Sequence, residues 1–200
     1  MKAKFLMDPF PHVLLEDFLT EGEWKSCMIE IHKLDPHLLP PEYSGTARDK
    51  KTGRPLKYNS GLFLSEAMPN SELISHSRRH MFQDLVTTCE DLPLWWEGQW
   101  RQNNHESWML SRYVHGQYYN AHVDLAQFTL LLWLHHEPKP FTGGDLIFAD
   151  YDNYTVPCNN NTGIIFYGPT RHEVPPVDGN GRYTLTCFTG VQNPVLKKTR

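Results

Sequence analysis

Three residues in the second half of the chain have the types and spacing of a metal site. His122 and Asp124 stand one residue apart in "YYNAHVDLAQ" (118–127), and His172 follows fifty residues later in "GPTRHEVPPV". If 118–127 is a strand, side chains two positions apart point to the same side of it. His122 and Asp124 can then offer a nitrogen and a carboxylate oxygen to one point, to which a distant strand brings His172.

The pair by itself fits an ordinary salt bridge as well as it fits a metal, but the third residue favours the metal. Two histidines and one carboxylate form the facial triad that holds Fe(II) in non-haem oxygenases and leaves other coordination positions open. Zinc accepts the same ligand types. The residues therefore predict a metal centre and leave the choice of metal open.

A buried cation is expected ten residues after His172. Arg182 opens the predicted strand "RYTLTCFTGV", and a guanidinium inside a β-sandwich is costly unless it meets an anion. Its planar fork suits a carboxylate. Thr184 faces the same way, so its hydroxyl can share that carboxylate. These residues predict a site for a dicarboxylic 2-oxo acid, bound to the metal at one end and to Arg182 at the other.

The elements that must position these residues are mostly strands. From about residue 107, short β-rich runs are separated by Gly, Asn and Pro turns, and no Gly-rich phosphate loop links a strand to a helix. We expect a mainly β (α+β) fold with a double-stranded β-helix, or cupin-like jelly-roll, core. Helices predicted at 14–34, with Thr20 and Glu23 as a capping box, and at 72–91 pack outside it.

The length and composition favour one soluble domain. The chain has 200 residues, with 40% hydrophobic and 21% charged residues and a net charge of −4. We expect a support region of helices and strands over 1–106 and a jelly-roll catalytic core over 107–191. The acidic balance argues against a nucleic-acid partner. No apolar run is long enough to span a membrane, no secretory signal is evident, and the four cysteines are scattered, which predicts a cytoplasmic protein with reduced thiols.

The segments around these residues resemble the Fe(II)/2-oxoglutarate-dependent dioxygenases, specifically their prolyl 4-hydroxylase-like branch. The segments occur in that family's order and at about its spacing. They are "RYVHGQYYNAHVD" (112–124), "FTLLLWL" (128–134), "FTGGDLIF" (141–148), "GIIFYGPTRHEVPPV" (163–177) and "GRYTLTCF" (181–188). A further segment, "YNSGLFLSE" (58–66), is similar to a strand that precedes the core in these enzymes.

The resemblance implies a role for each residue of the site. It assigns Fe(II) to three ligands: His122, Asp124 and His172. It assigns 2-oxoglutarate to a second group: Arg182, Thr184, Tyr113, Leu131 and Trp133. Trp133 departs from the Tyr often found at this place in the animal oxygen-sensing members, and its indole N–H can donate a hydrogen bond but not accept one.

The activity implied is the hydroxylation of a prolyl residue in a peptide or protein. 2-Oxoglutarate is decarboxylated to succinate and CO₂, O₂ is consumed, and ascorbate serves as reductant. Asp124 excludes the related halogenases, which lack this carboxylate. Phe188 stands where nucleic-acid demethylases of the superfamily carry a second Arg, so that activity is not expected.

Two alternatives to peptidyl proline hydroxylation stay open at this point. The same chemistry can act on a free amino acid or another small molecule, or the domain can be a non-catalytic cupin-like module that holds a metal. Arg182 and Thr184 argue against the module, which needs no carboxylate receptor. Substrate contacts are predicted at Tyr119 and, if the basic segment "ARDKKTGRPLK" (47–57) is a lid and not a solvated loop, at Arg48 and Arg54.

Overall fold

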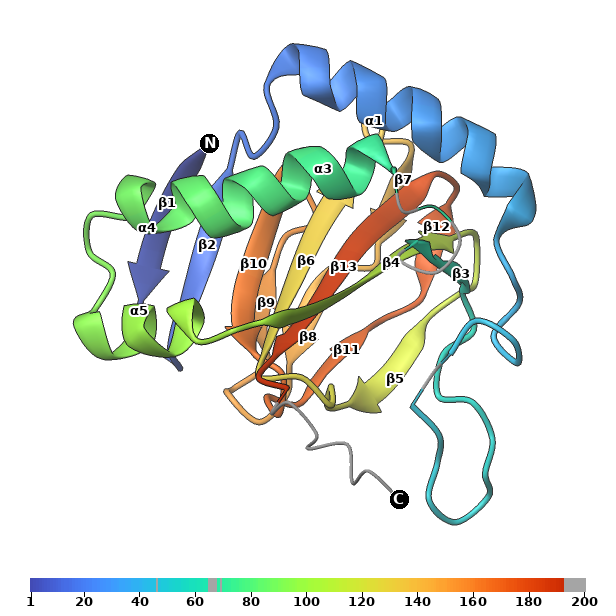
Figure 1. The fold of residues 1–200 in the computed structure, drawn as a ribbon. Helices are drawn as coiled ribbons and strands as arrows, with labels where there is room; N and C mark the ends of the chain where they lie inside the picture. The colour runs from blue at the N-terminus through green and yellow to red at the C-terminus, as the bar shows by residue number, and fades with distance from the viewer. Residues whose placement is uncertain (46, 65–67, 69, 193–200) are drawn as a thin grey trace, which may run out of the picture.

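A seven-stranded antiparallel sheet runs through the centre of the computed structural model, which describes residues 1–192 except 46, 65–67 and 69 (Figure 1). The rest of the chain, including part of the predicted strand 58–66, lies outside the described residues. In order across the sheet the strands are β1 (Lys2–Leu6), β2 (His12–Glu16), β10 (Thr162–Tyr167), β6 (Phe128–Leu134), β13 (Arg182–Gly190), β4 (His105–Tyr113) and β3 (Ser60–Phe63).

A smaller sheet lies against the large one and completes a jelly roll, as predicted. Its strands, in order, are β5 (Tyr119–His122), β11 (His172–Val174), β8 (Leu146–Phe148) and β9 (Tyr154–Val156). A separate pair is formed by β7 (Phe141–Gly143) and β12 (Val177–Gly179). The large sheet takes β1, β2 and β3 from the first 106 residues, so the predicted support region contributes strands as well as helices.

The central strand β6 shows how the sequence fixes the two faces of the large sheet. All seven residues of "FTLLLWL" are buried, because the strand is covered on both sides. Side chains alternate between the faces. Leu130 and Leu132 pack in the hydrophobic cluster on the helical side, whereas Leu131 and Trp133 pack in the cluster between the sheets. A strand covered on both sides has apolar residues at nearly every position, which is the pattern of this segment.

The first helix begins after its capping box and not at residue 14 as predicted, because residues 14–16 belong to β2. Thr20 and Glu23 form the expected capping box at the start of α1, and Ser71 caps α3. The predicted helix 72–91 is interrupted by a π-helical turn and ends at Thr88. The helical elements are α1 (Glu21–Leu34), a 3₁₀ turn (Asp35–His37), α3 (Glu72–Arg79), the π turn (His80–Asp84), α4 (Leu85–Thr88) and α5 (Leu94–Arg101).

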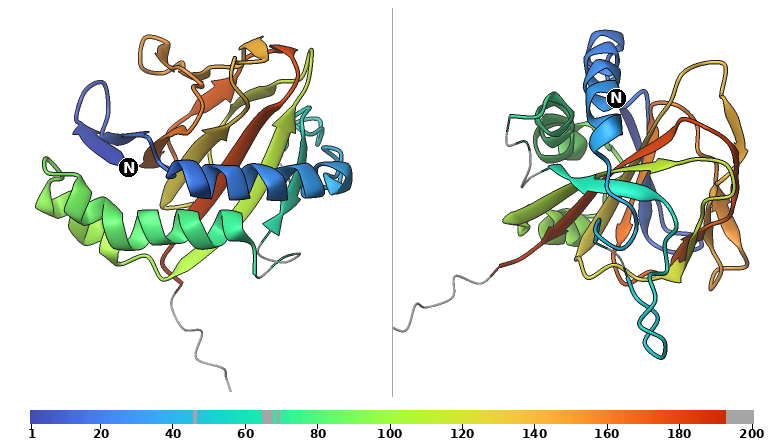
Figure 2. Two further views of the ribbon diagram at one scale, coloured as in Figure 1. Left: turned by 90° about the horizontal axis from the view of Figure 1, so that it is seen from above. Right: turned by 90° about the vertical axis from the view of Figure 1, so that its right-hand side faces the viewer.

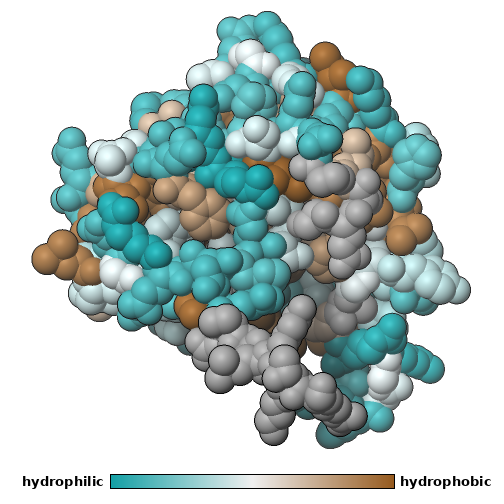
Figure 3. Space-filling model, viewed as in Figure 1, coloured by the Kyte–Doolittle hydropathy of each residue, from teal (hydrophilic) through white to brown (hydrophobic). Residues whose placement is uncertain are grey.

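These helices cover one face of the large sheet (Figure 2). α1 and α3 lie side by side, and their outer surface is largely hydrophilic (Figure 3). Within the described residues, no helix combines the length and apolar character needed to cross a membrane. All four cysteines are buried and free of disulfides, as the sequence predicts. The opposite face of the sheet is left to the smaller sheet and to the site.

A lysine is buried beside this inner face. The Lys57 side chain is fully enclosed, and its ammonium donates a hydrogen bond to the Ser44 carbonyl over 3.0 Å and lies 4.0 Å from the Met109 sulfur. No carboxylate among the described residues pairs with it. Burial lowers the pKa of Lys57 to about 8. The charged form is thus held in the fold at a cost, because its hydration is lost and no anion replaces it.

Lys57→Met should make the protein more stable at neutral pH and remove a pH dependence. The unfolded chain keeps the ordinary lysine pKa of 10.5, so between pH 8 and 10.5 it binds more protons than the folded chain. Wild-type stability therefore rises with pH across this window. The variant should gain about 2 kcal/mol at pH 7, allowing for the lost hydrogen bond, and show no such rise. Urea denaturation at pH 7 and pH 10 measures both effects. The same change in unfolding free energy with pH in wild type and variant would contradict the lowered pKa of Lys57.

Candidate metal centre and cosubstrate pocket

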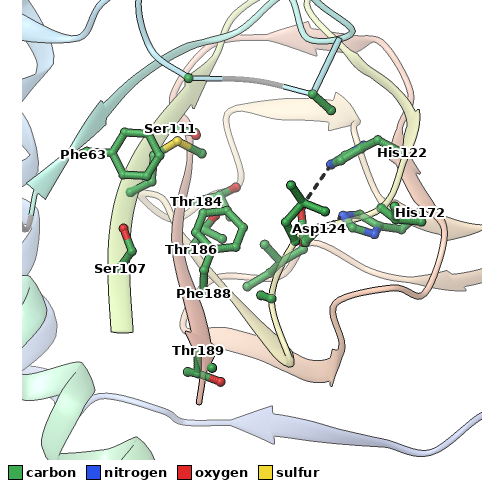
Figure 4. A pocket seen from close by; sticks show the side chains of 18 of the residues that line it. Phe63, Ser107, Ser111, His122, Asp124, His172, Thr184, Thr186, Phe188 and Thr189 are labelled. Carbon is green, nitrogen blue, oxygen red and sulfur yellow. Dashed lines mark ion pairs between the residues drawn. The ribbon is translucent and has the colours of Figure 1, made fainter. Parts of the chain in front are cut away.

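The three predicted metal ligands converge on one point between the sheets. One donor atom from each of His122, Asp124 and His172 lies within 4.8 Å of the others (Figure 4). The Nε2 atoms of His122 and His172 are each 3.7 Å from an oxygen of Asp124. This is too long for a hydrogen bond. The donors surround a common space instead of pairing with one another, which favours a metal site over a salt bridge.

The route by which Asp124 reaches this point differs from the prediction. Strand β5 ends at His122, and Asp124 lies in the turn that follows, so the two side chains do not share a strand face. The Asp124 backbone N–H donates to the Gly168 carbonyl over 2.9 Å, which holds the turn beside the segment that leads into β11. The donors converge because the turn curves back, and alternation along a strand was the wrong reason.

Neighbouring groups fix the orientation of each ligand. Nδ1–H of His122 donates to the Asn120 carbonyl and Nδ1–H of His172 to the Thr170 carbonyl, both over 2.9 Å. A carbonyl can only accept, so each Nε2 keeps its lone pair free for a metal. Thr129, which the sequence analysis did not single out, donates its hydroxyl to Oδ2 of Asp124 over 2.7 Å.

The charge states at this point also fit a divalent cation. Burial, with smaller contributions from His172 and Lys57, lowers the pKa of His122 to about 3 and keeps its ring neutral. Burial raises the pKa of the Asp124 carboxyl above its ordinary value, although His172 and Thr129 oppose the rise. A metal ion needs neutral imidazoles and favours the ionised carboxylate, so it would satisfy all three groups.

Arg182 is a buried cation without an acidic partner in the described chain. It is 1% exposed; Nε donates to the Gly144 carbonyl over 3.0 Å, and a terminal nitrogen donates to the Thr184 hydroxyl over 2.9 Å. Its guanidinium carbon lies 4.4 Å from the centre of the Tyr113 ring. Gly144 is required here, because its φ is +68° and a Cβ would stand 3.0 Å from Nε. The group is built to receive an anion.

A cavity of about 900 Å³ joins the donors to Arg182. Predicted residues that line it are Tyr113, Tyr119, Leu131 and Thr184, together with the donors and Arg182. Trp133 is fully buried and does not line the cavity. Its indole N–H has no partner among the described residues, and it stands opposite Thr184 in the β6–β13 pairing. The resemblance assigns both Leu131 and Trp133 to the cosubstrate space. Leu131 lines that space, whereas Trp133 lies behind Leu131.

The two predicted substrate arginines are not brought to the cavity. Arg48 and Arg54 lie in the exposed outer part of the 47–57 loop, and the Arg48 side chain donates to the Gly53 carbonyl of the same loop. The residues of this part of the chain that line the cavity are Gly45 and Ala47. Both arginines lie in water outside the cavity, and their contact with a substrate stays a prediction.

Sequence reasoning missed the far wall of the cavity. Figure 4 shows Phe63, Ser107 and Ser111 across the space from the donors, with side chains of β13 between. The wall residues are Ser107, Met109 and Ser111 on β4, and Thr186, Phe188 and Thr189 on β13. A signal was available: Ser107, Met109 and Ser111 stand at even spacings from Tyr113, and side chains at such spacings share a strand face.

Comparison with known proteins agrees with this site. Residues 108–190 match the model of the 2OG-Fe(II) oxygenase superfamily. A Pseudomonas putida prolyl-4-hydroxylase is 16% identical, with 91% of this chain and 93% of that chain covered and a TM-score of 0.57. A viral collagen prolyl hydroxylase from Paramecium bursaria Chlorella virus-1 is 18% identical, with 90% of this chain and 96% of that chain covered and a TM-score of 0.60. A Trichoplax adhaerens prolyl hydroxylase in complex with a hypoxia-inducible factor peptide fragment is 14% identical, with 90% of this chain and 83% of that chain covered and a TM-score of 0.65. No curated protein matches the chain.

The fold and the site are those of a jelly roll with three candidate metal ligands and a separate buried arginine. The matched segment 108–190 contains all three donors and Arg182. This segment is similar to the 2OG-Fe(II) oxygenase superfamily, whose members by that name take Fe(II) and 2-oxoglutarate, and the chain has a fold like that of prolyl 4-hydroxylases.

Thr129→Val should weaken metal binding about tenfold. Valine keeps the shape of this fully buried side chain but removes the hydroxyl that holds Asp124, and loss of such a supporting bond typically costs 10- to 100-fold in metal affinity. Anaerobic titration with Fe(II) measures the change. Thr155→Val, on the distant strand β9, is the matched control and should bind as wild type does. Equal affinities in the two variants would contradict the role of Thr129.

Proposed function

We propose that the protein hydroxylates a prolyl residue within a peptide or protein substrate. The observation that carries this proposal is the charge distribution of the cavity. Its volume of about 900 Å³ leaves room for a substrate beside the small cosubstrate. Among its described lining residues, Arg182 is the only lysine or arginine and Asp124 the only acid. Arg182 is assigned to the cosubstrate and Asp124 to the metal, so neither charge is left for the substrate.

A free amino acid is poorly matched to such a cavity. Its carboxylate and ammonium would each lose water on entry, and buried charges are costly unless they are paired. A residue inside a peptide carries neither charge at its backbone, so it can lie against the hydroxyls and apolar groups of the far wall. Three similar structures are prolyl hydroxylases, and one of them holds a peptide. These likenesses support a peptide over a small molecule.

The proposed roles follow the geometry of the site. His122, Asp124 and His172 hold Fe(II), with the orientation of each ligand set by its hydrogen bond. Bound Fe(II), with 2-oxoglutarate and O₂, supplies the oxidising chemistry that converts a substrate C–H to C–OH while 2-oxoglutarate becomes succinate and CO₂.

The distal carboxylate of 2-oxoglutarate is assigned to the group around Arg182. The guanidinium and the Thr184 hydroxyl receive it, and Tyr113 packs against the guanidinium. Leu131 provides an apolar wall. Trp133 lies behind Leu131 and does not line the cavity, so its contact with 2-oxoglutarate stays a prediction of the resemblance alone. A metal-binding module without turnover has no use for this anion site, which favours an enzyme.

Three further expectations stay predictions. They are ascorbate as the reductant, a cytoplasmic location, and the absence of nucleic-acid and membrane partners. The treatment of residues 1–200 as one catalytic domain is likewise a prediction.

Arg182→Gln should raise the 2-oxoglutarate concentration needed for half-saturation at least tenfold, because a charge-assisted bidentate contact is lost. The measurement is the visible charge-transfer band that forms when 2-oxoglutarate chelates Fe(II) without O₂. Arg112→Gln is the matched control. Arg112 lies on β4 and pairs with Asp35 away from the cavity. Unchanged 2-oxoglutarate affinity in Arg182→Gln would contradict the proposal that Arg182 binds the distal carboxylate.

Substrate class is tested by succinate release coupled to peptide mass gain. We expect turnover with peptides that contain an internal proline and none with free proline, because only the peptide lacks charges beside the reacting ring. Each active peptide should gain one oxygen atom on proline, and the same peptide with alanine in place of proline is the control. Turnover of free proline without turnover of any peptide would replace this proposal with the small-molecule alternative.

A further inference from the structure

One side chain, Tyr119, touches both a metal ligand and the 47–57 loop. Its ring stacks on the imidazole of His122, with centroids 3.6 Å apart and planes inclined by 10°. Its hydroxyl accepts a hydrogen bond from the Ala47 backbone N–H over 3.0 Å. Tyr119 and Ala47 also line the cavity. A movement of the loop would therefore displace the Tyr119 ring, which lies flat against the imidazole of His122.

The strand that carries His122 has little other support. β5 has four residues and lies at the edge of the smaller sheet, with β11 on one side. On its other side lies the C-terminal limb of the loop. The Asn120 N–H donates to the Leu56 carbonyl over 3.0 Å, and the Tyr58 N–H donates to the Tyr118 carbonyl over 2.9 Å. The Tyr119 hydroxyl extends this attachment to Ala47, on the opposite limb.

Two contacts determine where Nε2 of His122 points. The hydrogen bond from Nδ1 to the Asn120 carbonyl fixes one edge of the ring. The Tyr119 stack fixes its plane, because rotation of the imidazole would bring its edge against the face of the tyrosine. Removal of the stack leaves this hydrogen bond and the tilted contact with the His172 ring, whose centroid lies 4.3 Å away, to orient the ligand.

We propose that Tyr119 is a positioning residue that couples the 47–57 loop to the metal centre. Its ring holds the His122 imidazole in the plane suited to the metal, and its hydroxyl holds the loop closed over the cavity. The closed loop and the ordered ligand then stabilise each other. Such a coupling is reciprocal, so a metal that fixes His122 must also favour the closed loop.

The loop carries its own reporter of closure. Arg48, Lys50 and Lys51 are exposed trypsin sites, whereas the bond after Arg54 precedes Pro55 and resists trypsin. Cleavage requires several residues on each side of the bond to become extended, which for these sites includes Ala47. When opening is fast, the cleavage rate follows the population of the open loop.

The test measures trypsin cleavage after Arg48, Lys50 and Lys51 with and without Mn(II), in the absence of 2-oxoglutarate and substrate. In wild type, Mn(II) should slow cleavage. Tyr119→Phe should be cut about fivefold faster than wild type without metal, since one hydrogen bond is lost. Mn(II) should protect this variant much less. Tyr118→Phe is the matched control, because that ring stacks on Tyr58 and not on His122, and it should keep wild-type protection.

The second measurement is the affinity of the metal-free variants for Mn(II). Tyr119→Phe keeps the stack and should bind Mn(II) as wild type does, whereas Tyr119→Leu should bind at least fivefold more weakly. A merely structural tyrosine would not separate the two variants in this way. Equal Mn(II) protection of the loop in wild type and Tyr119→Phe, or no protection in wild type, would overturn the coupling. Equal Mn(II) affinity in Phe and Leu variants would overturn the role of the stack.

This inference rests on the metal centre and not on the proposed substrate. Both measurements use Mn(II) alone, so a failure of the prolyl peptide assay leaves them interpretable. Conversely, a failed coupling leaves the proposed hydroxylation standing.

Discussion

The site depends on the antiparallel pairing of two very short strands, β5 and β11. This pairing sets His122 opposite His172, two residues that are far apart in the sequence. A slip of one residue would turn one imidazole to the other face of the sheet. The bulge between His172 and Val174 makes the register irregular directly beside the ligand His172. β11 is secured on its other side by the pairing of Glu173 with Ile147, whereas β5 relies on the loop.

The fold accepts electrostatic costs that its ligands can relieve. Arg182 is buried without an acidic partner in the described chain, and burial works against the ionised form of Asp124. Each group favours a bound charge of opposite sign: an anion at Arg182 and a cation at Asp124. A ligand that carries a carboxylate and also chelates a metal answers both needs at once. Binding of such a ligand would offset both electrostatic costs, which is how a site can prefer a chelated dicarboxylate.

The sequence was most informative where one physical rule decides the outcome. The capping box at Thr20 follows from local hydrogen bonding, and the ligand set of His122, Asp124 and His172 follows from metal-ligand chemistry. The sequence pattern placed Asp124 on the same strand as His122. Alternating residue types look alike whether a strand continues or ends and is followed by a turn. Thr129 was missed because its contact crosses that turn. The direction of Arg48 and Arg54 depends on the path of a loop, which local residue types do not determine.

The metal and the anion site lie on different sheets, so their separation depends on how the sheets pack. Arg182 belongs to β13, held between β4 and β6, whereas the histidines belong to the smaller sheet. Phe166 of the large sheet meets the His172 ring edge to face, with centroids 4.9 Å apart. Phe148 of the smaller sheet packs on Phe166 at 5.1 Å. These aromatic contacts fix the spacing between the sheets, and with it the length of a cosubstrate that reaches from metal to guanidinium. The aromatic core thereby sets the distance that a ligand must span between the metal ligands and Arg182.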